Sequence, residues 1–454
     1  MPELISVGLD LGTTSTQLVV SRLAVQNRAS GFAVPELAIS GREILYQSPV
    51  YFTPLLEEKR MDAAAIRRIV EQEYRAAGIR REDVDTGAVI ITGETSRKEN
   101  AAAVMEAMAD LAGDFVVAAA GPDLESVLAA KGAGAAQYSE KTGETVLHMD
   151  IGGGTSNLAL IRRGEIAATG CLNVGGRLVK LQEGRISYVS PVLRGIWDGA
   201  VGQVLSREAG EELARLLASA LEMGAGLREP DDLLTRLTTR EAGSALPLNR
   251  PGEKMTLSFS GGVADCIDRE VPWQEYGDIG PLLGRAIRRS LLCRGKYVLG
   301  SQTIRATVIG AGCHSTQLSG STVFSQNVTF PLKNIPVITD EAQRNQYDTA
   351  CFLSLPGLEA PSYAALTQLA EKIANKVSPP VYLCLEQDMA KALGQALALR
   401  LGRDAPILCL DRVKVGRESY LDVAAPVGPA FPVVVKTLVL SRDGRDIATD
   451  WRKS

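Results

Sequence analysis

The 454-residue sequence predicts an α/β fold with two related lobes followed by a C-terminal α/β extension. Three observations support this fold class. A glycine-rich turn occurs at residues 10–15 and again, 140 positions later, at residues 150–155. Apolar segments of strand length alternate along the chain with amphipathic segments of helix length, as in layered α/β domains. The chain is also long enough for two or three domains that each bury a sizeable core.

Both copies of the turn are built in the same way. An apolar strand ends in an aspartate, a run of glycine and hydroxyl residues follows, and a second apolar strand comes next. Glycine lets the backbone approach a ligand closely, while successive backbone N–H groups and Thr or Ser hydroxyls form an anion-binding surface. We therefore predict phosphate contacts from Gly12, Thr13, Thr14, Ser15, Gly152, Gly153, Gly154 and Thr155.

Asp10 and Asp150 stand at the matching strand ends, beside the two turns. Their carboxylate oxygens are the hard ligands that Mg²⁺ prefers, either directly or through the waters that this ion keeps. We predict both aspartates as metal ligands and as catalytic groups. Paired turns of this kind suit a nucleotide that is held between two related half-molecules.

Other glycine-rich motifs fit the two turns poorly. A Walker P-loop needs Gly-Lys-Ser/Thr at the start of a helix, and neither turn contains a lysine. A dinucleotide fingerprint also needs its glycine turn to open a helix, whereas residues 16–20 and 157–161 are β-prone continuations. The remaining alternative is a pair of ordinary Asp-Gly hairpins. The matching aspartate behind an apolar strand in both copies favours the nucleotide site.

The composition argues against several classes of protein. Charged residues make up 22% of the chain and the net charge is −4, so the sequence indicates neither a nucleic-acid nor an anionic-membrane partner. No apolar run reaches the roughly 18 residues of a membrane-spanning helix. The seven cysteines are scattered without a Cys-x-x-Cys pair, as expected for reduced thiols in a cytosolic protein. His148 and His314 alone are too few for a multi-histidine metal site.

We expect three units without low-complexity linkers between them: a first lobe at 1–140, a second at 141–299 and the extension at 300–454. The periodicity predicts a helix over 62–77 in the first lobe, with one apolar face. The other expected helices span 98–111, 207–222, 278–291, 361–377 and 387–401, and the expected strands include 88–92, 145–149, 255–259, 381–385 and 407–410.

The two turns resemble those of the actin, hexokinase and heat-shock chaperone ATPase superfamily. This resemblance implies two ribonuclease-H-like lobes around a nucleotide cleft. It also implies that the turn at Gly261-Gly262, which follows a strand, contacts the adenosine, and that the helix at 276–287 connects the lobes. A plain strand-to-helix turn is the alternative for Gly261-Gly262. A second candidate for the adenosine turn, residues 307–312, ranks lower because it follows that helix.

Residues 91–96 lie at about the first connecting segment of that superfamily. Its members keep a polar residue near here that orients the attacking water or contacts the metal, and Glu94 is our candidate for this catalytic role. A solvated Glu94 beside a helix-capping Thr95 or Ser96 is the competing interpretation. We expect His148, within the strand that leads to Asp150, to be a hydrogen-bonded core residue.

A narrower resemblance covers the whole chain and is to the ATP-dependent reactivating factors of ethanolamine ammonia-lyase. It rests on residues 7–17, 91–95, 148–157, 259–263 and 433–438. The resemblance implies that ATP with Mg²⁺ drives release of damaged cobalamin from the lyase, so that intact adenosylcobalamin can bind. It implies ATPase activity in a chaperone-like role, ethanolamine ammonia-lyase and ATP/ADP as partners, and a cytoplasmic location with or without association with a bacterial microcompartment.

The sequence has no Asp-x-His-x-x-Gly motif for cobalamin, so we expect that cofactor to stay with the lyase. Two other functions fit the same fold. A small-molecule kinase would need a carboxylate base near its acceptor, and the sequence offers no convincing one beyond the two aspartates. An actin-like polymerising scaffold is the third class. Assays of ATP hydrolysis with and without the lyase, of pelleting and of small-molecule acceptors distinguish the three.

Overall fold

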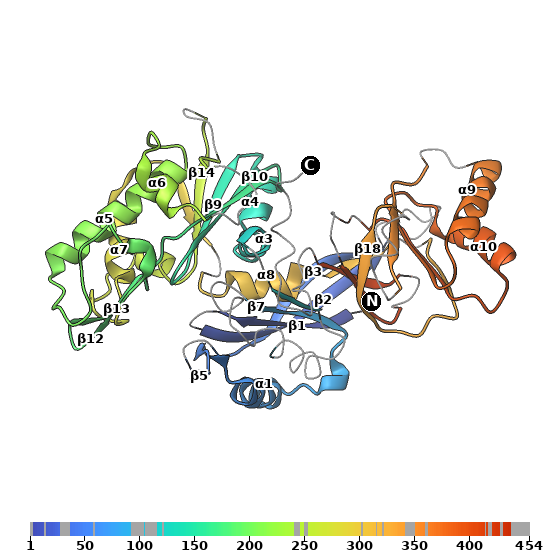
Figure 1. The fold of residues 1–454 in the computed structure, drawn as a ribbon, viewed down its shortest axis with the longest axis horizontal. Helices are drawn as coiled ribbons and strands as arrows, with labels where there is room; N and C mark the ends of the chain where they lie inside the picture. Colours follow the sequence, from blue (N-terminus) through green and yellow to red (C-terminus); the bar gives the residue numbers. More distant parts are fainter. Residues whose placement is uncertain are drawn as a thin grey trace.

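The structure of the protein is a computed structural model. It describes residues 3–12, 15–27, 37–57, 60–91, 104, 116–119, 122–239, 246–248, 253–300, 303–314, 316–319, 322–340, 350–358, 362–413, 415, 420–426 and 430–436. Three large sheets organise the chain, and Figure 1 shows them as three bodies, with the N-terminal sheet (blue) between the other two. No helix of the described residues is long and apolar enough to cross a membrane.

The first sheet has the strand order β3-β2-β1-β7-β8. Its first three strands are antiparallel neighbours, and β7 and β8 run parallel to β1. Apolar residues fill β1 and β7, and both strands are almost wholly buried. The strands are β1 (Glu3–Leu11), β2 (Ser15–Asn27), β3 (Leu37–Gln47), β7 (Thr86–Ile91) and β8 (Val116–Ala119), with the short β4 (Tyr51–Phe52) on the edge of β2 and the small hairpin β5 (Leu55–Glu57) and β6 (Arg60–Met61) next.

The second sheet repeats this topology. Its order is β11-β10-β9-β14-β15, again with three antiparallel strands followed by two parallel ones. The strands are β9 (Val146–Ile151), β10 (Ser156–Arg162), β11 (Glu165–Leu172), β14 (Thr256–Ser260) and β15 (Tyr297–Leu299). Two sheets with this order and these directions are two ribonuclease-H-like lobes. The predicted α/β duplication is confirmed.

Two helices cross between these sheets (Figure 1). α3 (Pro122–Gly132) packs on β9, β10 and β11, whereas α8 (Ala306–His314) packs on β1, β2 and β7. Glycines make the close crossing possible. A Cβ on Gly132 would lie 1.8 Å from the carbonyl oxygen of Ala306, and one on Gly310 would lie 2.0 Å from that of Leu128. Any side chain there would therefore push the helices apart.

The crossing corrects two expectations. Residues 307–312 form part of helix α8, so they are not an adenosine turn. The helix expected at 276–287 is α7 (Gly280–Arg289), and it packs on α5 (Arg207–Gly224) within the second lobe instead of connecting the lobes. The packing also crosses the boundaries expected at residues 140 and 299. Helix α3 belongs to the first expected unit but packs on the second sheet, and α8 belongs to the third unit but packs on the first sheet. The three-unit division stays a proposal.

Helix α1 (Ala63–Ala77) covers the first sheet with the apolar face that its periodicity predicts. Asp62 accepts a hydrogen bond from the Ala65 N–H at 2.9 Å and begins the helix, and Gly78, with a φ of 68°, ends it. The buried face consists of Ile66, Val70, Glu73 and Tyr74. In the second lobe lie α4 (Ala135–Thr142), α6 (Asp232–Leu237), β12 (Val179–Gln182) and β13 (Arg185–Val189).

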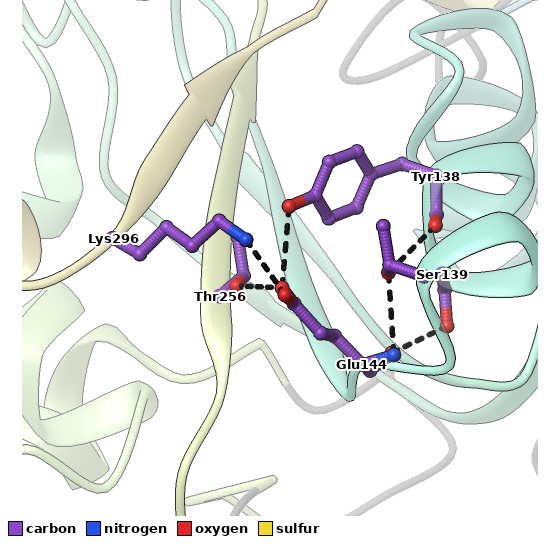
Figure 2. Close-up of polar contacts among 6 residues, drawn as sticks. Tyr138, Ser139, Glu144, Thr256 and Lys296 are labelled. Carbon is purple, nitrogen blue, oxygen red and sulfur yellow. Dashed lines mark hydrogen bonds and ion pairs between the residues drawn. The ribbon is translucent and has the colours of Figure 1, made fainter.

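A polar cluster fastens α4 to the amino ends of the second sheet's parallel strands (Figure 2). The Glu144 carboxylate accepts hydrogen bonds from Thr256 at 2.6 Å and from Tyr138 at 3.2 Å. It also pairs with the Lys296 ammonium at 2.6 Å, and this bond holds the pKa of Glu144 below its usual range. The cluster lies at the opposite end of β9 from Asp150, so it supports the sheet and not the turns.

The extension contains an eight-stranded sheet with α9 (Tyr363–Lys376) and α10 (Ala390–Leu401) packed on it. Four central strands run parallel, as the expected strand-helix rhythm requires. In sheet order the strands are β16 (Thr316–Leu318), β23 (Pro432–Lys436), β22 (Tyr420–Val423), β18 (Leu332–Ile338), β19 (Phe352–Leu355), β20 (Val381–Leu385), β21 (Ile407–Leu410) and β17 (Phe324–Gln326). All seven cysteines of the chain are buried.

Candidate functional site

The two glycine turns are the same hairpin built twice. In the first, the Gly12 N–H donates to the Ser15 carbonyl at 2.8 Å. In the second, the Gly152 N–H donates to the Thr155 carbonyl at 2.9 Å. Each turn therefore closes with a hydrogen bond between equivalent positions. Thr13 and Thr14, predicted to bind phosphate, lie outside the described residues.

The second turn has an open glycine face. A Cβ on Gly154 would meet nothing within 4 Å, and this residue is exposed. Behind the turn, the carbonyls of Gly152 and Gly153 accept hydrogen bonds from the N–H groups of Gly176 at 3.0 Å and Arg177 at 2.6 Å. Within the described residues, the N–H groups of Gly153 and Gly154 have no acceptor in the protein. A rigid turn with free N–H groups fits a phosphate.

Asp10 and Asp150 occupy equivalent positions at the ends of β1 and β9, where they are 8% and 7% exposed. The residue directly opposite each aspartate on the neighbouring strand carries an amide, Gln17 in the first hairpin and Asn157 in the second. Directly opposed residues of an antiparallel pair share one face of the sheet. Each hairpin therefore places a carboxylate next to an amide.

The amide oxygens of Gln17 and Asn157 are buried, and among the residues that the structure describes they have no hydrogen-bond partner. A buried, unpaired oxygen is unfavourable by about 1–3 kcal/mol, and a ligand that supplies a donor or a cation removes that penalty. Sequence reasoning missed both amides, although each lies seven positions after its aspartate. The two carboxylates and two amide oxygens are hard donors, so this donor set fits a Mg²⁺ ion that keeps most of its waters.

No cluster of three or more His, Cys, Asp or Glu side chains suited to a metal exists within the described residues. Glu94, our third catalytic candidate, lies outside the described residues, as does most of the segment around it.

A chain of side chains in the second sheet orients Asp150. Ser260 donates its hydroxyl hydrogen to Asp150 Oδ1, and Thr307 of α8 donates to Oδ2 at 3.4 Å. Burial raises the pKa of Asp150, and these two hydrogen bonds partly oppose that shift. Because Thr307 belongs to the helix that packs on the first sheet, the aspartate of the second lobe is tied directly to the first.

His148 is the buried, hydrogen-bonded core residue that the sequence predicts. Its Nδ1 lies 3.0 Å from the Ser258 hydroxyl and its Nε2 lies 2.9 Å from the Ser260 hydroxyl. Burial lowers the pKa of His148 to about 3, so the imidazole is neutral at physiological pH. Because the Ser260 hydroxyl donates its hydrogen to Asp150, the Ser260 oxygen accepts a hydrogen bond from His148 Nε2–H. The Ser258 hydroxyl then donates to His148 Nδ1. Side chains alternate between the two faces along a strand, so Ser258 and Ser260 of β14 lie on the same face of the sheet.

The Gly261-Gly262 turn follows β14 directly, and its two glycines differ. Gly261 has a φ of 87°, and a Cβ there would lie 2.3 Å from the Ile151 carbonyl oxygen. This glycine is therefore required for packing against the second hairpin. Gly262 has open space, because the nearest atom to its Cβ position is in the Ile304 side chain at 3.9 Å. A ligand could approach only Gly262 without displacing protein atoms.

Two ribonuclease-H-like lobes joined by crossing helices, with a matched hairpin in each, define an actin-like ATPase fold. A model of the family described as ethanolamine utilisation protein EutA matches residues 2–354 and 342–441 of the chain. The chain belongs to this family.

Two relatives carry the name ethanolamine ammonia-lyase reactivase EutA. The Salmonella typhimurium protein is 39% identical over 471 residues, covering 96% of this chain and 98% of the relative. The Escherichia coli protein is 38% identical over 465 residues with the same coverage. Among solved structures, the Ppx/GppA family member from Aquifex aeolicus is 12% identical with a TM-score of 0.42, covering 68% of this chain and 97% of that one.

Proposed function

We propose that this protein reactivates ethanolamine ammonia-lyase at the expense of ATP, by releasing damaged cobalamin so that intact adenosylcobalamin can bind. The observation that carries the ATP part is the pair of hairpins, each closed by the same hydrogen bond and each with an aspartate and an amide at the same positions. The family and the names of the two relatives support the lyase as the partner, and a cytoplasmic location is part of the proposal.

The turn residues hold the nucleotide in this proposal. The N–H groups of Gly153 and Gly154, and those of the residues that follow Gly12 in the first turn, bind the phosphates. Thr13, Thr14, Ser15 and Thr155 add hydroxyl donors, and Gly12 and Gly152 close the two turns. Gly262 faces the adenosine, and Gly261 keeps the turn in place. Fixed donors of this kind stabilise the charge that develops during phosphoryl transfer.

Asp10 and Asp150 hold a hydrated Mg²⁺, which when bound neutralises phosphate charge. The His148–Ser260 chain keeps the Asp150 carboxylate in one orientation, and the neutral imidazole adds no competing positive charge. Glu94 remains our candidate for orienting the attacking water. The kinase alternative shares this metal site and differs in the acceptor.

The segment between β15 and α8 links the nucleotide site to both lobes. Gln17 donates to the Ile304 carbonyl at 3.3 Å, and Arg305 donates to the Ser48 carbonyl at 2.9 Å. Thr307, in the first turn of α8 directly after this segment, donates to Asp150. A nucleotide that binds one lobe arrangement more tightly than another would therefore move α8, and α8 packs on β16 of the extension. We propose this route from nucleotide to lyase.

The test is ammonia release by a lyase inactivated with damaged cofactor, after incubation with this protein, ATP, Mg²⁺ and free adenosylcobalamin. Activity should return only when every component is present. The protein alone should not deaminate ethanolamine. If ATP binds but a cognate lyase stays inactive, the reactivase proposal fails and the small-molecule kinase takes first place.

Asp10→Asn and Asp150→Asn should each reduce Mg²⁺-dependent ATP turnover at least tenfold while the protein stays folded. Asp411→Asn is a matched control, because Asp411 is also a buried aspartate directly after an apolar strand, but in the third sheet. Turnover at the wild-type rate in both of the first two variants would disprove the metal-site assignment.

A further inference from the structure

Arg177 lies against the second glycine turn. Its backbone N–H donates to the Gly153 carbonyl at 2.6 Å. Its side-chain carbon Cδ lies 3.3 Å from the position that a Cβ on Gly153 would occupy. The stem of the arginine therefore runs along the turn that we propose binds phosphate. Its backbone position is fixed by that turn, 24 residues away in sequence.

The guanidinium group is held by Asp278. Arg177 Nε lies 3.3 Å from Asp278 Oδ2, and the second oxygen of this carboxylate accepts from the Gly280 N–H at 2.8 Å. The Asp278 side chain is 8% exposed, whereas that of Arg177 is 28% exposed. The ion pair therefore has a buried acidic end and a basic end that reaches solvent.

The same guanidinium reaches the first lobe. Its Cζ lies 5.8 Å from the centre of the Phe52 ring, a cation–π distance. Phe52 is opposite Ser15 in the β2–β4 pair, directly beside the first glycine turn. Its neighbour Tyr51 donates to the buried Glu73 carboxylate at 2.5 Å, which anchors β4. Phe52 itself is 80% exposed.

Arg177 thus extends from the second turn to the residue next to the first. We propose that Arg177 binds the polyphosphate end of ATP between the two turns, with Asp278 and Phe52 as the residues that position its guanidinium. The inference rests on the proposed nucleotide site. It adds a residue that distinguishes nucleotides by the number of their phosphates.

The chemistry of arginine suits this role. A guanidinium carries five N–H donors in a plane, and the bond to Asp278 uses Nε, so the two terminal nitrogens have four further N–H groups. A planar fork of this kind binds phosphate oxygens in pairs, and stacking over an aromatic ring leaves its edge available. Lysine keeps the charge but has no such fork.

The experiment measures the affinities of wild-type protein and of Arg177→Gln for ATP, ADP and AMP with Mg²⁺, by competition against a fluorescent ATP analogue. We expect at least a tenfold loss for ATP, a smaller loss for ADP and less than a twofold change for AMP. Arg228→Gln is the matched control, because Arg228 also pairs with a buried carboxylate, that of Glu222 at 2.7 Å. All three affinities should be unchanged in that variant.

Wild-type protein that does not bind ATP would refute the proposed function itself. Wild-type protein that binds ATP, together with an Arg177→Gln variant of equal affinity, would refute only this inference. An equal loss for all three nucleotides would also refute it, since it would show that Arg177 merely supports the fold. If Arg177→Gln does not fold, Arg177→Lys decides: at least a threefold loss for ATP with AMP unchanged supports the inference, and unchanged ATP affinity overturns it.

Discussion

Replacing Gly132 by alanine tests whether the crossing of α3 and α8 sets the relation between the lobes. The added Cβ would lie 1.8 Å from the Ala306 carbonyl oxygen, and real Cβ atoms do not come closer than about 3.0 Å to such atoms. The helices must therefore separate by about 1.2 Å at this point, the difference of these two distances.

This displacement has an expected energy and an expected structural effect. Forcing an extra carbon into a well-packed contact is unfavourable by about 1–3 kcal/mol. In an unhindered helix the same substitution stabilises by about 0.5–1 kcal/mol, so the two cases differ in sign. Thr307 follows Ala306, and its 3.4 Å hydrogen bond to Asp150 would break when α8 moves away.

The measurement is the free energy of unfolding in urea, with nucleotide affinity as a second readout. Gly295→Ala provides the control, because a Cβ on Gly295 would meet nothing within 4 Å. The free energy of unfolding of this control should stay within about 0.5 kcal/mol of the wild-type value. A Gly132→Ala variant as stable as wild type, or more stable, would show that the crossing is not the close contact described above.

Three further predictions concern the second lobe. Burial raises the pKa of Asp150, so the stability linked to this shift is present below the unfolded-state pKa and is lost as the pH rises through the folded-state pKa. Without nucleotide, Asp150→Asn should thus unfold at higher temperature than wild type at neutral pH, with a difference that shrinks in acid; an unchanged difference would contradict the burial of the charge. The lowered pKa of His148 acts in the opposite direction. The stability of the fold that is linked to this shift is present above pH 6.5 and is lost as the pH falls towards about 3. In His148→Asn the acid loss of unfolding free energy should be shallower by up to about 1.4 kcal/mol per pH unit, and parallel pH profiles would disprove this. Gly262→Val should weaken nucleotide binding in a folded protein, whereas Gly261→Val should destabilise the fold because its Cβ meets Ile151; calorimetric titration and thermal unfolding separate the two effects.

Local patterns determined the parts of the site that lie within one hairpin. The aspartate, the glycine turn and the two flanking apolar strands are contiguous in sequence, so the repeat at 10–15 and 150–155 was sufficient to predict both hairpins. The buried His148 followed from its place within an apolar strand. In the same way, the apolar periodicity over residues 62–77 predicted helix α1.

The segment at 307–312 shows where local patterns mislead. Glycines and β-branched residues there resemble a strand followed by a turn, yet they form helix α8. Gly310 faces the Leu128 carbonyl of α3, and Gly312 faces the Gly8 backbone in β1. These glycines are present because another backbone lies against them, and a distant backbone leaves no local pattern in the sequence.

The sequence by itself therefore determined the two hairpins, the aspartates at their ends and the α/β class, because neighbouring residues produce each of them. Only the tertiary structure placed Ser260 and Thr307 on Asp150, and Arg177 between the turns. The contacts of Asp150 with Ser260 and Thr307, and of Arg177 with Phe52, each join residues more than 100 positions apart. The two contacts of Asp150 depend on how β14 pairs with β9 and how α8 crosses α3. Strand order and helix crossing are decided by the burial of whole apolar faces, which no single motif encodes.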